Sequence, residues 1–420
     1  MIKIGILGVG TVGASVANIL EENADIIEAR AGKKIVVQTG VVKNLSKDRG
    51  VNIVLTDNAM DVVNDPEIDI IVELMGGVDE PYTLVRQALE NGKSVVTANK
   101  ALLAYHRYEL QEIAGDIPLM YEASTAGGIP IIGALRTGLS ANHIESIQGI
   151  MNGTCNYMLT KMIKEGALYD EILKESQELG YAEADPTFDV GGFDASHKLL
   201  ILASIAYGID AKPEDILIEG IENITQTDVE FAKEFGYEIK LLGIAKKVGD
   251  GVELRVHATM IPKESMIAKV DGVMNAVTVV GDRVGETMYY GPGAGGDATA
   301  SAVISDIVDI VRGNQGPMLG YKKGLESGLK LLSKDEIITH YYLRLEVDDR
   351  SGVLATITST LGEFDISIKT MLQKPTDNRD RAKLLFTTHT CKESRMQDAI
   401  RALGELSVVH GKIAMMRIEK

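Results

Sequence analysis

The chain has 420 residues, of which 45% are hydrophobic, and its formal net charge is -17 from 43 basic and 60 acidic side chains. This length allows two or three domains, each with a core of its own. The negative charge argues against a nucleic-acid or anionic-membrane partner, because both bind cationic surfaces. A small polar ligand fits better.

The cysteine content and the N-terminus indicate the compartment. Cys155 and Cys391 lie far apart in no metal-ligand spacing, so neither a disulfide framework nor a zinc site is predicted. The N-terminus enters a strand without a secretory signal, and no apolar run of about 18 residues follows. We therefore expect a cytoplasmic protein.

A glycine-rich turn, GVGTVG, follows the first predicted strand at 3–7 and opens a helix. In this setting the glycines allow a tight turn and a close approach of the backbone to a pyrophosphate at the helix N-terminus. The turn predicts a dinucleotide site at Gly8, Gly10, Thr11, Val12 and Gly13.

The end of the second predicted strand, at 35–42, bears on the choice of dinucleotide. An acidic residue there would bind the ribose 2′-hydroxyl of NAD. This chain has Lys43 instead, with Lys47 and Arg49 nearby. A cation at this position would bind the 2′-phosphate of NADP. Alternatively, these three residues belong to a basic loop that is merely solvated. The sequence favours NADP over NAD.

Two further strands lead to a second lysine. They are predicted at 68–74 and 94–97, with a helix at 80–90 between them, and the second runs into Lys100. Ligands meet parallel sheets at the carboxyl ends of the strands. We therefore expect Lys100 at the nicotinamide end of the cofactor.

A loop that reads EASTAGGIP follows the strand predicted at 118–121 and begins with Glu122. Its glycines would expose main-chain carbonyls around one carboxylate, and such oxygen ligands suit a hard cation. A plain turn is the other interpretation.

The stretch 180–202 places polar side chains at the mouth of an apolar run. They are Glu183, Asp185, Asp189, Asp194 and Lys198. Asp194 is expected to cap a helix at 195–206, with Lys198 four residues on over the same face. One carboxylate and one ammonium would then point together, whereas the plainer interpretation is a helix cap beside a polar loop.

Further predicted elements complete a second domain of the α+β class. Helices are expected at 159–179 and 195–206, and strands at 239–247 and 252–260. The loop YYGPGAGG then precedes a helix that ends near Gly313, which is a second helix start suited to an anion.

The C-terminal part shows a different order of elements. The stretch 313–338 is rich in Gly, Lys and Ser, which predicts a connector with a short helix. Beyond it the order βαββαβ, that of a ferredoxin-like unit, is predicted at 342–347, 352–364, 366–372, 383–390, 394–406 and 408–418.

The motifs of this chain, taken in their order along the sequence, resemble those of the homoserine dehydrogenases, and the resemblance covers essentially the whole chain. The matching stretches are TANKALLA, GIMNGTCNYML, GYAEADPTFDVGGFDASHKL and YYGPGAGG. The turn DDRSGVLA resembles that of ACT modules, with Ser351 where proline is usual. The resemblance implies an α/β chain with a Rossmann dinucleotide-binding domain at 1–135, an α+β substrate and dimerisation domain at 136–312, a linker at 313–338 and a ferredoxin-like (ACT) regulatory domain at 339–420.

The resemblance also implies a reaction, the NAD(P)H-dependent reduction of aspartate 4-semialdehyde to homoserine. An ammonium can stabilise and then protonate the aldehyde oxygen, and Lys198 is the first candidate for this donor, Lys100 the second. Gly295 would contact the cofactor. Glu183 would bind the substrate ammonium, and the other substrate residues would be Asp189, Asp194, Gly153 and Thr154.

Three further features are implied only by the resemblance. One is a structural sodium ion held by Glu122 and the carbonyls of Thr125, Gly127 and Ile129. Another is a homo-oligomer, either a dimer or a tetramer. The third is threonine as an effector, bound at the turn of Gly352.

Two other functions stay open. Cys155 could form a thiohemiacetal, as in covalent aldehyde dehydrogenases, but its motif contains no histidine base, and we interpret it as a packing residue. The chain could also be a catalytically inactive amino-acid sensor. The presence of Lys100 and Lys198 argues against that function.

Overall fold

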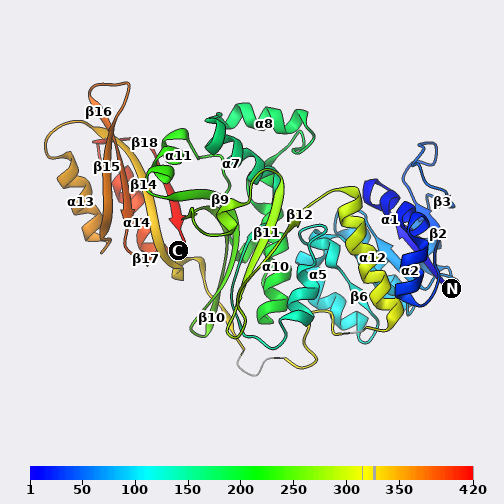
Figure 1. Ribbon diagram of the computed structural model, residues 1–420. Coiled ribbons are helices and arrows are strands. Elements are labelled where there is room, and N and C mark those ends of the chain that lie inside the picture. The colour runs from blue at the N-terminus through cyan, green and yellow to red at the C-terminus, as the bar shows by residue number, and fades with distance from the viewer. Residues whose placement is uncertain (315, 325–327, 420) are drawn as a thin grey trace. The chain divides into compact units, whose positions relative to one another are not determined.

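The computed structural model of the chain (Figure 1) describes residues 1–314, 316–324 and 328–419. It divides into two compact units. The first contains Met1–Gly153, Asp194–Pro213 and Val273–Leu329, and the second contains Thr154–Phe193, Glu214–Gly272 and Lys330–Lys420. No helix in the described part of the chain has both the length and the apolar character that a membrane span requires.

A six-stranded parallel sheet forms the N-terminal part of the first unit. Its strand order, β3-β2-β1-β4-β5-β6, is that of a Rossmann fold, with the topological switch point between β1 and β4. All four residues of β4 are buried, as expected for the centre of a parallel sheet. The strands are β1 (Ile2–Leu7), β2 (Ile35–Val41), β3 (Leu55–Thr56), β4 (Ile70–Glu73), β5 (Ser94–Thr97) and β6 (Leu119–Met120).

Helices from distant parts of the chain share the core of this sheet. The returning helix α12 (Gly296–Arg312) lies beside α1 (Thr11–Glu22) and α2 (Ala24–Ala31) (Figure 1). Their apolar side chains pack with those of β1 and β4 in one buried cluster. The other helices of this part are α3 (Ala59–Asn64), α4 (Asp79–Glu90) and α5 (Lys100–Ala114).

Three antiparallel strands and one buried helix complete the first unit. Strand β11 (Met274–Gly281) pairs with β7 (Ile144–Ile150) and with β12 (Gly285–Pro292). In α10 (Phe193–Tyr207), every residue except Phe193 and Ala206 is buried. A helix that is buried on all sides holds its polar side chains away from water, so each needs a partner.

The second unit begins with two helices where the sequence predicted one at 159–179. Helix α7 (Gly153–Glu165) ends just before Gly166, and α8 (Tyr169–Glu178) follows. Gly166 has φ of +70°, a left-handed conformation that glycine adopts readily and that ends a helix. The long strands β9 (Tyr237–Val248) and β10 (Gly251–Pro262) then form an antiparallel pair.

The C-terminal part confirms the predicted ferredoxin-like order. The sheet order is β18-β14-β16-β15, and α13 and α14 pack on it around a single apolar cluster. The elements are β14 (Ile338–Asp348), α13 (Val353–Glu363), β15 (Ile368–Pro375), β16 (Arg381–Thr388), α14 (Glu393–Gly404) and β18 (Val409–Ile418). In the predicted linker, a short 3-10 helix forms at Lys334–Glu336, while residues 315 and 325–327 lie outside the described residues.

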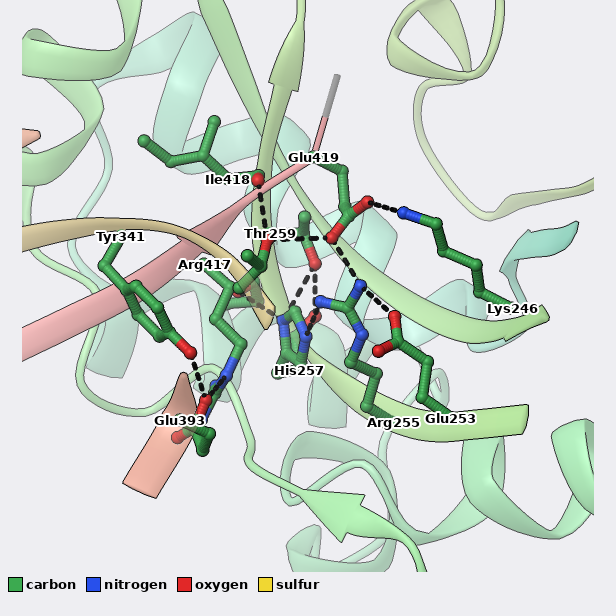
Figure 2. Close-up of polar contacts among 12 residues, drawn as sticks. Lys246, Glu253, Arg255, His257, Thr259, Tyr341, Glu393, Arg417, Ile418 and Glu419 are labelled. Carbon is green, nitrogen blue, oxygen red and sulfur yellow. Dashed lines mark hydrogen bonds and ion pairs between the residues drawn. The ribbon is translucent and has the colours of Figure 1, made fainter. Parts of the chain in front are cut away.

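Buried ion pairs connect β18 to its neighbours in the second unit (Figure 2). Arg417 is fully buried and binds Glu393 and also Glu219, the latter through two contacts of 2.8 and 2.9 Å. Arg255 of β10 is also fully buried and binds Glu419 at 2.5 Å. Removing one partner of a buried ion pair leaves an uncompensated charge and costs about 3–5 kcal/mol. The last strand is therefore firmly joined to β10.

Candidate active site

Three charged side chains of the first unit meet at the start of α10. Asp194 and Lys198 lie four residues apart, and Lys198 Nζ is 2.8 Å from Asp194 Oδ2. Lys100 is the first residue of α5, and its Nζ lies 2.5 Å from Asp194 Oδ1. One carboxylate thus bridges two ammonium groups, and the structure brings together both predicted catalytic lysines.

The prediction that Asp194 caps α10 is wrong. The helix begins at Phe193, so Asp194 lies in its first turn. Its carboxylate accepts hydrogen bonds from side chains, namely Asn152 Nδ2 at 3.0 Å and Lys198 Nζ. A neighbour one turn along the helix, Lys198, and a residue from a distant segment, Asn152, therefore orient it, and it has no capping role. Asn152 is a residue of this site that the sequence analysis missed, because its partner lies on a distant helix.

Burial strengthens these contacts. Asp194 is 3% exposed and Lys198 is 9% exposed, whereas the side chain of Lys100 is 34% exposed. Burial opposes the charge on Asp194, but the ammonium groups of Lys198 and Lys100 outweigh it and hold the pKa of this carboxyl well below its usual range. Lys198 Nζ also donates to the Met151 carbonyl at 2.6 Å. Its ammonium is thus held between two acceptors.

The first glycine motif forms the turn between β1 and α1. Gly8 has φ of +102°, and a Cβ there would lie 2.8 Å from a main-chain oxygen that follows β4. A Cβ at Gly13 would lie 2.3 Å from the Gly8 carbonyl oxygen, but one at Gly10 would meet nothing within 4 Å. Gly8 and Gly13 are thus needed for the turn itself, and Gly10 leaves room where a pyrophosphate can approach Thr11 and Val12.

The second glycine-rich loop reaches the same helix. Gly295 has φ of +122° and precedes α12. A Cβ at Gly296 would lie 2.7 Å from Ser15 Oγ and 3.3 Å from Thr11 Cγ2. The loop therefore packs against α1, and Gly295 lies beside the helix start at which the pyrophosphate is expected.

Lys43 lies at a cavity beyond the end of β2. The cavity has a volume of about 410 Å³, and its lining includes Lys43, Asp57, Asn58 and Met75. Lys43 is exposed. In a Rossmann fold the adenosine half of the dinucleotide binds at this edge of the sheet, so a 2′-phosphate could reach the lysine.

Glu73 is a buried acid at the same edge of the sheet that the sequence analysis did not single out. Its carboxylate accepts hydrogen bonds from the Met75 N–H at 2.7 Å and the Thr97 hydroxyl at 2.5 Å. Burial raises the pKa of Glu73 to about 7, although these hydrogen bonds oppose the shift. A lone carboxylate at the end of an apolar strand was the signal in the sequence.

The loop that begins at Glu122 gathers oxygen atoms. The Glu122 carboxylate accepts the N–H groups of Ile132 and Gly133, each at 2.7 Å. The hydroxyls of Ser124 and Thr125 are buried and have no hydrogen-bond partner among the described residues. This oxygen-rich set fits a hard cation.

Two of the three predicted carbonyl ligands, Gly127 and Ile129, have well-defined surroundings. Gly127 has φ of +56° and packs so closely on Gly293 that a Cβ would lie 2.6 Å from its carbonyl group. The Ile129 carbonyl accepts the Ile131 N–H at 2.8 Å. No group of three or more His, Cys, Asp or Glu side chains that could hold a metal is found in the described ranges, so any cation here would depend on main-chain oxygens.

Gly153 and Thr154 begin α7 but fall in different units. A Cβ at Gly153 would lie 2.6 Å from the Val273 carbonyl oxygen, so only glycine fits there. In the second unit, the Thr154 hydroxyl donates to the Tyr181 carbonyl at 2.6 Å. This contact connects the start of α7 to the polar loop at 180–192.

The remaining predicted residues belong to the second unit. Glu183 is exposed in the polar loop, and Asp189 lies in a short helix, Thr187–Val190. Cys155 is fully buried, and its thiol donates to the Asp189 carbonyl at 3.3 Å. This contact fits a packing role for the cysteine. The substrate-binding roles of Glu183 and Asp189 stay predictions.

Three known families match successive parts of the chain. The NAD-binding domain of homoserine dehydrogenase matches residues 8–116, homoserine dehydrogenase matches residues 130–308, and the ACT domain matches residues 341–408. The chain is 54% identical to a homoserine dehydrogenase of Helicobacter pylori over 418 residues, which is 100% of this chain and 99% of that protein. It is 45% identical to one of Pseudomonas aeruginosa over 430 residues, which is 100% and 99% of the two chains.

Solved structures show the same similarity. A homoserine dehydrogenase from Thiobacillus denitrificans has 47% identity and a TM-score of 0.95, with 100% of this chain and 98% of that chain covered. A hyperthermophilic archaeal homoserine dehydrogenase in complex with NADPH has 28% identity and a TM-score of 0.64, with 73% of this chain and 97% of that chain covered.

Proposed function

Because the chain belongs to the homoserine dehydrogenase family, we propose that Asp194, Lys198 and Lys100 carry the oxidoreductase chemistry of that family. The observation that supports this proposal best is the single buried carboxylate bridging two lysines at 2.5 and 2.8 Å. The predicted Rossmann, substrate and ACT domains all have their counterparts in the family. Neither a covalent aldehyde dehydrogenase nor an inactive sensor is supported.

Lys198 is the proposed proton donor. NAD(P)H, when bound, supplies the hydride that reduces aspartate 4-semialdehyde to homoserine. As the aldehyde oxygen gains negative charge, an ammonium within hydrogen-bond reach stabilises it and then protonates it. Lys198 is held by Asp194 and by the Met151 carbonyl, so its position is fixed before the reaction. Lys100 adds a second positive charge on the other carboxylate oxygen.

The proposed substrate contacts come from four other residues. Glu183 would bind the α-ammonium of the substrate, and Asp189 would orient the substrate or a water molecule. Gly153 and Thr154 would contact the substrate at the start of α7. The exposure of Glu183 in a polar loop supports a role in ligand binding rather than in packing.

For the cofactor, we propose a preference for NADP over NAD. Lys43 is exposed beside the cavity at the end of β2, where a 2′-phosphate would need a cation. Arg49 follows in the same loop, and its buried Nε has no hydrogen-bond partner among the described residues. Two cationic side chains in this loop fit a phosphate better than a hydroxyl.

Other parts of the proposal follow from family membership. A sodium ion would be held by Glu122 and the carbonyls of Thr125, Gly127 and Ile129, and the buried hydroxyls of that loop support a site for a hard cation. Threonine would act as an effector through the ACT domain, in a homo-oligomer. A cytoplasmic location remains a prediction from the sequence.

A turnover assay of Cys155→Ala tests this function against covalent catalysis. Direct hydride transfer requires neither phosphate nor coenzyme A, so the variant should reduce aspartate 4-semialdehyde at close to the wild-type rate in their absence. A covalent enzyme would instead oxidise the aldehyde with NAD(P)+ to a thioester on Cys155 and release it to phosphate or coenzyme A. Phosphate- or coenzyme A-dependent reduction of NAD(P)+ that Cys155→Ala abolishes, in place of homoserine formation, would contradict the lysine mechanism.

A further inference from the structure

Asn275 is a buried polar side chain that the proposed mechanism does not use. It lies on β11 and is 1% exposed, and neither its Oδ1 nor its Nδ2 has a hydrogen-bond partner in the described part of the chain. On the same face of this strand, Val277 and Val279 are fully buried and apolar. Buried amides are normally paired, because an unpaired one loses its hydrogen bonds to water without replacement. An apolar side chain at this position would avoid the free-energy cost of burying an unpaired amide.

The side chain of Asn275 lies against the second glycine-rich loop. A Cβ at Gly293 would lie 2.1 Å from Asn275 Cγ, 2.1 Å from Nδ2 and 2.4 Å from Oδ1. Three side-chain atoms so close to one point mean that the carboxamide lies flat on Gly293. A Cβ at Gly153 would lie 3.6 Å from the same Oδ1. Asn275 therefore separates the cofactor loop, residues 291–296, from the turn at Gly153.

Contacts on the far side hold the cofactor loop in place. Gly127 packs on the Gly293 carbonyl group, and Gly296 packs on Thr11 and Ser15 of α1. The loop is thus held between β11, the loop that begins at Glu122, and the helix that starts the dinucleotide site. A small shift of Gly293 relative to Asn275 would move Gly295 relative to α1.

We propose that Asn275 is a positioning residue for hydride transfer, and that its carboxamide pairs with the main chain of the cofactor loop when that loop contacts the dinucleotide. The proposal rests on the proposed function, since it assumes that Gly295 contacts the cofactor. If the Asn275 amide is paired only when the dinucleotide is bound, its hydrogen bonds favour cofactor binding, because the unbound protein leaves the amide unpaired. Asn275 would then influence the affinity for the cofactor and fix the position of the cofactor loop relative to the turn at Gly153.

The variant that tests this role is Asn275→Leu, which keeps the approximate shape of the side chain and removes its polar atoms. We expect thermal stability equal to or above that of the wild type, because a buried unpaired amide has been removed. In the direction of homoserine oxidation, we also expect KM for NADP+ and for NAD+ to rise by the same factor, about tenfold, the size expected for one or two hydrogen bonds. KM for homoserine should change by less than about twofold.

Thr278→Val is the matched control on the same strand. The Thr278 hydroxyl donates to the Gln148 carbonyl at 3.1 Å, so its removal should lower thermal stability and leave both cofactor KM values unchanged. A change at the 2′-phosphate site would affect only the NADP form of the cofactor. An equal effect of Asn275→Leu on both cofactors therefore distinguishes this variant from one that alters that site.

Two results would overturn the proposal. Wild-type cofactor KM values in Asn275→Leu would mean that the amide has no role in the reaction. A loss of stability with equal losses for cofactor and homoserine would mean a general structural role. If this variant does not fold, Asn275→Ser is measured in its place and must show the same selective loss. Failure of the proposed function would appear separately, as a wild-type enzyme without turnover.

Discussion

Replacing Asp194 by asparagine tests whether the bridging carboxylate organises the active site. The substitution keeps the shape of the side chain and removes the charge that lies 2.5 Å from Lys100 Nζ and 2.8 Å from Lys198 Nζ. Removing one partner of a buried ion pair costs about 3–5 kcal/mol. Because about a third of the Lys100 side chain is exposed, solvent screening favours the lower end, about 3 kcal/mol.

The pH dependence of this loss has a definite sign. The pKa of Asp194 is held below its usual range, so its stabilisation is present above the unfolded value, about 4, and is lost as pH falls towards the lower folded value. At neutral pH the full loss should therefore appear in Asp194→Asn. Urea unfolding at neutral pH measures it.

Turnover should fall more than stability explains. A lysine that is no longer held in place loses part of the factor of about 10²–10⁴ that a general acid provides, and we expect a fall of at least about 10²-fold in kcat/KM for homoserine. Asp228→Asn is the control, since Asp228 is 1% exposed and binds Arg344 Nε at 2.7 Å in the second unit. It should lose similar stability and keep its turnover. Asp194→Asn with near-wild-type turnover would reduce the carboxylate to a structural role.

Three further variants test the cofactor site, the sheet edge and the effector site. Lys43→Ala should weaken NADPH relative to NADH by about 1.5–3 kcal/mol at most, and equal effects on both KM values would mean that Lys43 does not meet the 2′-phosphate. Glu73 has a folded pKa of about 7 against a reference of 4.5, so the stability it contributes is present below the reference value and is lost as pH rises through the folded one. Glu73→Gln should abolish this pH-dependent loss in the free energy of unfolding, which is at most about 3 kcal/mol. The test is to compare unfolding curves of the variant at about pH 5 and about pH 8. If the variant keeps the wild-type difference in stability between these pH values, Glu73 is not its source. Gly352 has φ of +91° at the start of α13, so Gly352→Ala should strain the turn by about 1 kcal/mol or more and relieve inhibition by millimolar threonine. A wild-type enzyme that threonine does not inhibit would remove the effector role altogether.

The buried ion pairs of the second unit make a point variant a cleaner test of the effector site than a truncation. Ending the chain near Leu332 would remove Arg417 and Glu419, which pair with Glu219 and Arg255. The truncated protein would keep unpaired charges beside β10, so a loss of threonine sensitivity could follow from unfolding alone. A change confined to the Gly352 turn avoids this difficulty.

Local rules account for the parts of the site that the sequence predicted. The contact between Asp194 and Lys198 follows from their spacing of four residues on one helix, and the strand-turn-helix setting of the first glycine motif predicts the turn at Gly8 and Gly13. The approach of Lys100 to Asp194 is not local. Its prediction came from the position of Lys100 at the carboxyl end of a parallel strand, together with the resemblance.

The residues that the sequence analysis missed depend on distant partners. Glu73 carries only the signal of a lone carboxylate at the end of an apolar strand, and Asn152 carries none. Only the folded chain brings them to Thr97 and Asp194. The capping role of Asp194 was wrong because the helix begins two residues earlier than the apolar pattern indicates. The fold was easier to predict than these contacts, because strand and helix order depends on patterns that recur along the chain.

The most direct test of the mechanism is the single-turnover rate of hydride transfer in Lys198→Ala. The Lys198 account predicts a loss of about 10²-fold or more, with homoserine and cofactor binding retained and with part of the rate restored by an added primary amine. Lys100→Ala should lose less, because Lys198 keeps its contacts with Asp194 and Met151. A near-wild-type rate in Lys198→Ala, or a larger loss in Lys100→Ala, would contradict the assignment of Lys198 as the proton donor.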